Sequence, residues 1–388
     1  MERADVVVVG CGILGTSVAY HLAKRQAGLR VLVLEKEKSP CTGSTPLSAG
    51  GIRAQFSTEV NIRLSTSAIA FYETMSDALE CHFDFEQHGY LLVTTEEETA
   101  ARFKANVELQ RSLGVPVELL EPAAIKARWP HLETSDLLLG TFSGTDGYAD
   151  PYEATMGFWQ ATRRMPNKGG VEFRFATPVT GIHHEDGRVT GVSTERGQIT
   201  APWVIDCAGP WLAEVGELAG LDLQAEPVRR CLWNTEPFDL IKDKIPLTID
   251  MDTGFYTRSE SGGLMLGLAN TKEPPGFNPI LDDEWLEVVI ERALLRIPCL
   301  EHAEVNRGWA GHYSITRDHL PILGEVPWLK GFLSCGGFSG HGFMHAPPAG
   351  LLMAEIVCEG EATTIDISAL GIERFRGGGA LTPEANVI

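Results

Sequence analysis

The hydrophobic pattern at the start of the chain predicts a strand, a helix and a second strand in immediate succession. Residues 5–9 read DVVVV, an unbroken apolar run that is typical of a buried strand. Between Thr16 and Arg25 the apolar residues recur at helical spacing, and residues 31–34 (VLVL) repeat the buried-strand pattern. This order indicates an α/β unit built on a parallel sheet.

The turn between the first strand and the helix reads GCGILG over residues 10–15, and Glu35 directly follows the second strand. In this setting Gly10 makes the tight turn, Gly12 lets a pyrophosphate approach the backbone, and Gly15 lets the helix pack closely on the strand. Glu35 would accept hydrogen bonds from an adenosine ribose. The complete unit predicts a dinucleotide-binding site, and these residues alone leave FAD and NAD as alternatives.

The rest of the chain continues the mixture of helices and strands. We expect helices over residues 58–79, from a capping box at Thr95 and Glu98 to near Gly114, from Pro122, over 283–296 and over 350–357. Strands are expected at 90–93, in short runs between 171 and 204, and in an antiparallel alternation from 226 to 280. The predicted fold class is α/β, with a Rossmann-type unit beside a mostly antiparallel region.

Size and charge narrow the possible functions. A chain of 388 residues exceeds the length at which one core usually keeps growing, so we expect two intertwined domains. The chain has 32 Lys and Arg residues and 52 Asp and Glu residues. The resulting formal net charge of −20 argues against binding of nucleic acid. No stretch of the sequence approaches the ~18 consecutive apolar residues of a membrane-spanning helix.

The eight cysteines are scattered without a CxxC pair or metal-ligand spacing, so neither a disulfide framework nor a metal site is predicted. This cysteine usage fits a reducing compartment. The first strand begins within five residues of the start, which leaves no room for a cleavable presequence. We therefore expect a cytoplasmic protein.

Six ordered motifs carry a resemblance to a known family. They are the dinucleotide unit, GSTPLSAGGIR at 43–53, DGYADP at 146–151, CAGPW at 207–211, the segment from GWAG at 308–311 to DHLPILG at 318–324, and GFSGHGF at 337–343. Together they resemble the D-amino acid oxidase superfamily of flavoproteins. Within it, the chain is most similar to the branch of sarcosine oxidase β subunits, proline dehydrogenase β subunits and dimethylglycine dehydrogenase. The resemblance spans essentially the whole chain.

The resemblance implies FAD rather than NAD, and a discontinuous FAD-binding domain. That domain would comprise residues 1–88, 146–224 and 306–388. Residues 89–145 and 225–305 would form the substrate domain, a mostly antiparallel sheet with helices that roofs the flavin.

The resemblance also implies which residues hold FAD, mostly through the backbone. Ser44 and Thr45 would meet the pyrophosphate, and Val179, at the end of a short strand, would contact the adenine. The 337–343 motif would bring amides against the flavin, in front of a helix nucleated near Pro347 and Pro348. The implied set is Gly10, Gly12, Ile13, Leu14, Gly15, Glu35, Lys36, Ser44, Thr45, Ala49, Gly50, Gly51, Val179, Ala208, Gly209, Trp211, Gly337, Gly340, His341, Gly342, Phe343 and Met344.

The chain also departs from the family's motifs. Some relatives attach the flavin covalently through a His or a Cys at the places of Leu47 and Gly311, so we expect non-covalent FAD. Two carboxylate anchors of the relatives, an arginine in a GxRP element and a lysine after GHGF, are absent, and Met344 stands at the lysine position. Arg53 is the main remaining candidate, with a structural role on loop carbonyls as an equal alternative. Weaker candidates are Arg258, Tyr256 and His312.

The implied reaction is oxidation of a secondary, N-methylated or cyclic amino acid, by hydride transfer from its α C–H to flavin N5, to give an imine. Met265 stands where sarcosine oxidases carry a lysine that promotes reaction with oxygen, which favours a dehydrogenase with another acceptor, such as a partner protein or subunit. A structural role is favoured for each histidine near the C-terminal motifs. The candidate catalytic positions are Arg53, Tyr256, Met265, His312, His341 and Met344.

Three alternative functions remain open from the sequence. The first is a peroxide-forming amino acid oxidase, and the second is a flavin-bound assembly protein without turnover. The third is a 2-hydroxy acid dehydrogenase with the same fold.

Overall fold

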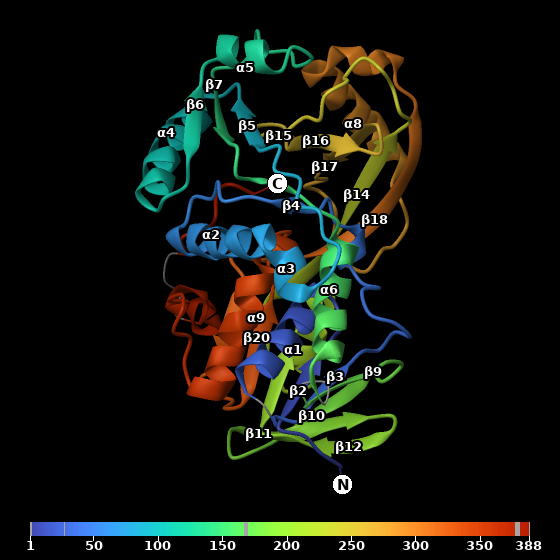
Figure 1. Ribbon diagram of the computed structural model, residues 1–388, viewed down its shortest axis with the longest axis vertical. Helices are drawn as coiled ribbons and strands as arrows, with labels where there is room; N and C mark the ends of the chain where they lie inside the picture. Colours follow the sequence, from blue (N-terminus) through green and yellow to red (C-terminus); the bar gives the residue numbers. More distant parts are fainter. Residues whose placement is uncertain (1, 27, 167–169, 377–380, 388) are drawn as a thin grey trace.

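The computed structural model describes residues 2–26, 28–166, 170–376 and 381–387. Along the long axis of the molecule the fold has two parts (Figure 1). The lower part in that view contains a mainly parallel sheet with helices, and the upper part contains a larger, mainly antiparallel sheet. The predicted α/β fold, with an antiparallel region beside a Rossmann-type unit, is confirmed.

The lower part is organised around a six-stranded sheet in the order β19-β20-β13-β2-β3-β9. Neighbouring strands run parallel except for β19 and β20. The strands are β2 (Val6–Val9), β3 (Val31–Leu34), β9 (Val171–Arg174), β13 (Trp203–Asp206), β19 (Ile322–Glu325) and β20 (Phe332–Gly336).

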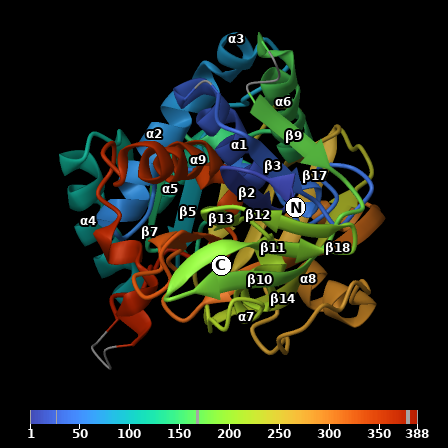
Figure 2. The same cartoon turned by 90° about the horizontal axis from the view of Figure 1, so that it is seen from below.

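Both faces of this sheet are buried, which explains the unbroken apolar runs of its strands. Val6 and Val8 belong to the core that the sheet forms with helices α1, α6 and α9, whereas Val7 and Val9 belong to the core shared with strands β10, β11 and β12. Figure 2 shows these helices and strands on opposite sides of β2 and β3. The elements are α1 (Ile13–Arg25), α6 (Pro151–Arg164), α9 (Gly342–Glu359), β10 (Val179–Glu185), β11 (Arg188–Thr194) and β12 (Gly197–Thr200), with β1 (Glu2–Arg3) paired to β12.

The upper part is built on an eight-stranded sheet in the order β18-β14-β17-β16-β15-β5-β7-β6. All of its neighbours are antiparallel except β15 and β5. The strands are β5 (Tyr90–Thr94), β6 (Val117–Leu120), β7 (Leu139–Ser143), β14 (Ala225–Thr235), β15 (Leu247–Asp250), β16 (Phe255–Glu260), β17 (Gly263–Leu268) and β18 (Val305–Thr316). Its helices are α4 (Glu97–Ser112), α5 (Pro122–Arg128) and α8 (Asp283–Arg296).

Shorter elements lie between the two parts in Figure 1. Helix α2 (Glu59–Glu73) is followed by α3 (Met75–Leu79), and β4 (Gly51–Ile52) pairs with β8 (Gly147–Tyr148). Helix α7 (Leu212–Glu217) follows β13 in the lower part. No helix in the described ranges is both long enough and apolar enough to pass through a bilayer.

Four sequence-based boundaries need correction. The helix expected over 58–79 is broken at Thr74, whose ψ of 4° is not helical. The Thr95–Glu98 capping box does not form, because α4 begins at Glu97 and the Thr95 hydroxyl donates to Asp252. Helix α1 begins at Ile13 rather than Thr16. The domain boundary expected near residue 306 falls inside β18, which pairs with β14 along its length and so belongs to the eight-stranded sheet.

Candidate active site

In the turn after β2, the backbone angle or the surrounding space explains why each of the three positions is glycine. Gly10 has a φ of +99°, in the region that favours glycine. A Cβ on Gly15 would lie 2.0 Å from the Gly10 carbonyl oxygen, so only glycine lets α1 approach the turn this closely. A Cβ on Gly12 would meet the Thr45 Oγ1 at 3.3 Å and otherwise face a cleft.

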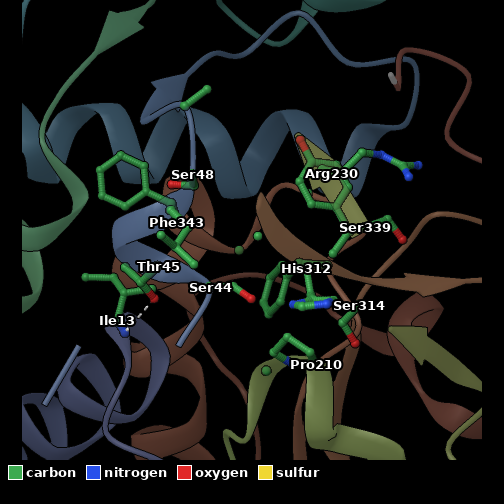
Figure 3. Close-up of a pocket in the computed structure, with 18 of the residues that line it drawn as sticks. Ile13, Ser44, Thr45, Ser48, Pro210, Arg230, His312, Ser314, Ser339 and Phe343 are labelled. Atoms are coloured by element: carbon green, nitrogen blue, oxygen red, sulfur yellow. Dashed lines mark hydrogen bonds between the residues drawn. The ribbon is translucent and has the colours of Figure 1, made fainter. Parts of the chain in front are cut away.

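The first turn of α1 opens onto this cleft. Its N-cap residue is Gly12, which has no side chain to bond the first amides. The Ile13 N–H donates to the Thr45 Oγ1 at 3.4 Å, as the dashed line in Figure 3 marks. Free first-turn amides and the helix dipole attract anions. The start of α1, with Ser44 and Thr45 beside it, is therefore suited to a pyrophosphate.

Glu35 is fixed at the end of β3 by backbone amides. Its carboxylate accepts hydrogen bonds from the N–H of Cys11 at 2.8 Å and of Glu37 at 2.9 Å. Each carboxylate oxygen has a second lone pair, so both can still accept bonds from ribose hydroxyls. The side chain lines the same cleft as Gly12.

We call this cleft the outer cleft. The Lys36 ammonium lies 3.3 Å from the centre of the Trp211 ring at its wall. Val179 also lines it, as the first residue of β10. The predicted residues that line the outer cleft are Gly10, Gly12, Ile13, Leu14, Glu35, Lys36, Ser44, Thr45, Val179, Ala208, Gly209 and Trp211.

The outer cleft continues past Thr45 into a second space, which we call the central cavity. The two share Ile13, Leu14, Ser44, Thr45, Gly209 and Pro210. Figure 3 shows Ser48 and Phe343 on one side of the cavity and Arg230, Ser339 and His312 on the other. Its further lining residues include Leu47, Ala49, Leu232, Tyr256, Gly311, Tyr313, Gly337, Gly340 and Gly342.

The two places where some relatives attach their flavin face each other in the central cavity. A Cβ on Gly311 would lie 3.0 Å from the Leu47 Cβ. Both residues line the cavity, and neither carries a nucleophilic atom. The structure therefore brings together two positions that are 264 residues apart in the sequence, as expected if they border one ligand.

A third space, the inner chamber, adjoins the central cavity. It shares Ser48, Ala49, Tyr256, Tyr313, Ser339, Gly340 and Phe343 with that cavity. The predicted residues Gly50, Gly51, Arg53, His341 and Met344 line the inner chamber. The buried Met344 side chain, at the start of α9, gives this chamber an apolar wall.

Arg53 uses its donors on backbone carbonyls. Its buried guanidinium donates to the Gln55 carbonyl at 2.7 Å and to the Asn386 carbonyl, and lies 4.0 Å from the centre of the Phe56 ring. Arg258 is held similarly, by the Ala49 carbonyl at 2.8 Å and Glu260 at 2.9 Å. These contacts favour the structural alternative for Arg53 over the carboxylate anchor.

The predicted histidines lie in different places. His341 is buried in the inner chamber, and burial together with the Arg53 guanidinium holds its pKa well below 6.5, so it is neutral. His312 lines the central cavity, where burial also lowers its pKa, and its ring nitrogen lies 3.0 Å from the Asn278 carbonyl oxygen. Neither geometry gives the cavity a charged general acid.

Helix α9 begins at Gly342, eight residues before the expected start, so Pro347 and Pro348 lie inside it. Proline at 347 leaves the Phe343 carbonyl without its helical donor. The Tyr72 hydroxyl replaces that donor at 2.6 Å. The prolines therefore do not nucleate the helix, and the first amides of α9 arise directly from the Gly342–Phe343 segment at the cavity wall.

Met265 does not line the central cavity. It is a buried residue of β17 within an apolar cluster that also contains Leu232 and Tyr256, which do line that cavity.

Sequence reasoning missed two residues of the cavity, Arg230 and Tyr313. Both line it, and the Arg230 guanidinium lies 5.2 Å from the centre of the Tyr313 ring. They belong to the paired strands β14 and β18, whose register sets Arg230 opposite Gly311. The available signal was the Arg229–Arg230 doublet on a predicted strand, which must place one guanidinium on each face.

The loop that carries Arg53 is hydrogen-bonded to the buried carboxyl group of Asp146, which has an unusual pKa. Burial raises the pKa of Asp146 to about 7, although bonds from the Gln55 side chain (3.1 Å) and the Ala54 N–H (3.0 Å) favour its ionised form. The folded protein thus holds this proton more tightly than the unfolded chain. The stability from this group is complete below pH ~4 and is lost as the pH rises through 7.

We expect Asp146→Asn to remove this pH dependence. In urea titrations, the difference in unfolding free energy between wild type and variant should shrink from pH 5 to pH 8, because only the wild type loses stability by ionising residue 146. The exposed Asp84→Asn serves as the control for removal of a carboxyl group at the surface. A constant difference for Asp146→Asn would contradict the raised pKa.

Among the described residues, no three His, Cys, Asp or Glu side chains come together as metal ligands. The cavities are lined mostly by backbone, apolar and hydroxyl groups, with a few charged side chains such as Glu35, Lys36 and Arg230. The outer cleft fits the ADP half of a dinucleotide, and the central cavity fits a flat, largely apolar ring system.

Comparison with known proteins agrees with this geometry. The family model described as "FAD dependent oxidoreductase" (DAO) matches residues 5–356. FAD-dependent oxidoreductase domain-containing protein 1 of Bos taurus is 32% identical over 96% of this chain and 85% of that protein. Dimethylglycine dehydrogenase of Rattus norvegicus is 29% identical over 93% of this chain, which corresponds to 43% of that longer protein.

A solved structure is also similar along the whole chain. The crystal structure of L-proline dehydrogenase from P. horikoshii has a TM-score of 0.89 and 31% sequence identity, and the match covers 97% of this chain and 99% of that chain.

Proposed function

Because the chain belongs to the FAD-dependent oxidoreductase (DAO) family, we propose that it oxidises the CH–NH bond of a secondary, N-methylated or cyclic amino acid to an imine. The observation that carries this proposal is the continuous space from the Gly12 turn to the central cavity. It has an anion site at one end and a largely apolar site at the other. The similarity to proteins named dimethylglycine dehydrogenase and L-proline dehydrogenase supports amino acids of this kind.

FAD would lie with its ADP half in the outer cleft and its ring in the central cavity. The first amides of α1, with Ser44 and Thr45, would hold the pyrophosphate, and Glu35 would hold the ribose. The N-terminal amides of α9 would face the ring. When bound, FAD would supply the hydride acceptor for the substrate's α C–H bond.

The chain's own contribution is to position the substrate and to keep its nitrogen neutral. The central cavity is lined by no Asp or Glu within the described ranges, and it contains the Arg230 guanidinium. A cation near an amine lowers the pKa of its ammonium form. The site therefore favours the neutral amine that hydride removal requires, without a dedicated general base.

We expect the flavin to be non-covalent, because neither Leu47 nor Gly311 offers a nucleophile. Precipitation of the purified holoprotein with acid should release all of the yellow chromophore into the supernatant. Mass spectrometry of the protein should give the mass of the unmodified chain. Flavin that stays in the pellet would contradict this expectation.

We also infer that the electron acceptor is not oxygen. No lysine lines the central cavity among the described residues, and Met265 is packed behind it in an apolar cluster. A buried cation beside the flavin would stabilise the superoxide anion that forms first. Without one, reaction of the reduced protein with oxygen should be slow, and an acceptor dye should reoxidise it faster.

The test is an anaerobic substrate panel, followed by admission of air. Sarcosine, dimethylglycine, proline, hydroxyproline, glycine, D-amino acids and 2-hydroxy acids are mixed with the oxidised holoprotein, and loss of flavin absorbance is recorded. Reduction by a secondary or N-methylated amino acid is expected. Reduction by none of them would overturn the proposal, and rapid recovery of colour in air would overturn its dehydrogenase half.

A further inference from the structure

Two neighbouring arginines of β14 have opposite surroundings. Consecutive residues of a strand point to opposite faces of a sheet. The Arg229 guanidinium lies 2.8 Å from the Glu273 carboxylate and 3.0 Å from that of Asp282, so its charge is balanced within the protein. Arg230 lines the central cavity instead.

Arg230 is incompletely satisfied. Its Nη1 donates to the Arg229 carbonyl at 3.0 Å, but its buried Nε has no hydrogen-bond partner within the described part of the chain. Among the described residues, no Asp or Glu lies within ion-pair distance of the Arg230 guanidinium, whereas Arg229 has two such acids. A partly buried cation with free donors is unfavourable on its own, and a ligand anion would satisfy both needs.

The surroundings of Arg230 suit a carboxylate. Tyr256 and Tyr313 line the central cavity beside it, and both also line the inner chamber. Burial raises the pKa of each phenol, so both keep their protons and can donate hydrogen bonds at neutral pH. The other two arginines near these spaces are occupied, Arg53 by two carbonyls and Arg258 by a carbonyl and Glu260.

We propose that Arg230 binds the carboxylate of the substrate, with the hydroxyls of Tyr256 and Tyr313 as further donors. The inference rests on the proposed function, because it assumes an amino acid in the central cavity. The carboxylate anchor would then belong to β14 of the eight-stranded sheet, rather than to the Arg53 loop or the start of α9. It also predicts selection for amino acids over the amines that lack the carboxylate.

A binding experiment tests the anchor without turnover. Pyrrole-2-carboxylate, which the flavin cannot oxidise by the proposed route, is titrated into the oxidised holoprotein, and the flavin spectrum reports binding. Arg230→Met should weaken binding at least ~50-fold, and Arg230→Lys about 10-fold, because lysine keeps the charge but loses the bidentate geometry. The control Arg307→Met removes an exposed guanidinium from β18 and should change affinity less than twofold.

A second measurement compares proline with pyrrolidine as anaerobic reductants. Proline should reduce the flavin of the wild type much faster than pyrrolidine does. In Arg230→Met, both compounds should reduce the flavin at similar, slow rates. If Arg230 served the flavin instead, the pyrrolidine rate would fall as well, and that outcome would overturn the anchor. If Arg230→Met does not retain flavin, Arg230→Lys carries the same comparison.

The outcomes separate this inference from the proposed function. Wild-type binding of pyrrole-2-carboxylate that Arg230→Met loses, without reduction by any amino acid, would support the anchor and overturn the function. Reduction of wild type and Arg230→Met at equal rates by proline would support the function and overturn the anchor. Failure of the wild type to bind the carboxylate would also overturn the anchor.

Discussion

Gly15→Ala is expected to produce a protein without bound flavin. The new Cβ would lie 2.0 Å from the Gly10 carbonyl oxygen and 3.0 Å from its carbon. Both are backbone atoms of the tight turn, so no side-chain rotation can relieve the clash. Helix α1 must move away from β2, and the amides that would hold the pyrophosphate move with it. We expect at least ~100-fold weaker flavin binding and a loss of about 3 kcal/mol in stability.

Flavin content measured from the absorbance ratio, together with urea unfolding, checks this expectation. The matched control is Gly144→Ala, because Gly144 is exposed and its new Cβ would come no closer than 3.6 Å to the Phe142 side chain. That variant should keep its flavin and its stability. A Gly15→Ala protein purified with a full complement of flavin would show that the turn can relax, contrary to the geometry.

The dinucleotide unit could be predicted from the sequence because its determinants are local. The strand, the three glycines, the helix and Glu35 lie within 35 residues, and each has a short-range reason to be where it is. The sites of backbone contact followed from the family motifs. The structure gathers these residues around the outer cleft and the central cavity, while their contacts with FAD stay predictions.

Partners that are distant in the chain could not be predicted in the same way. The start of α9 was misplaced because the prolines suggested a first helical turn. The donor that makes an internal Pro347 tolerable is the Tyr72 hydroxyl, and it bonds a carbonyl 271 positions away in the chain. Likewise, nothing local to Arg53 shows that the Asn386 carbonyl, 333 positions on, occupies its guanidinium.

Arg230 illustrates the same limit for a functional residue. Its sequence neighbour Arg229 looks equivalent, and the two differ only in the face of β14 that each occupies. The acids that balance Arg229 are 44 and 53 positions away, in the segment before α8. The alternation of side chains along a strand shows that one arginine of the doublet faces inward. Only the fold shows which of the two has no Asp or Glu partner among the described residues.

The second large effect is expected at Glu384, which fastens the C-terminal segment to the start of α2. Its buried carboxylate accepts hydrogen bonds from the backbone and hydroxyl groups of Ser57 and Thr58 and from the side-chain amide of Asn61, at 2.6 to 3.1 Å. It also places a negative charge at the N-terminus of a helix. Glu384→Ala leaves these buried donors without an acceptor, and we expect a loss of about 3–5 kcal/mol in unfolding free energy.

Urea unfolding of the holoprotein measures this loss, with Glu59→Ala as the control. Glu59 lies in the first turn of the same helix but is exposed and pairs only with Arg63 among the described residues, so its removal should cost less than about 1 kcal/mol. Because the Asn386 carbonyl holds Arg53, detachment of the segment should also free that guanidinium for solvent. Equal stability of the two variants would mean that the C-terminal segment does not support the Arg53 loop.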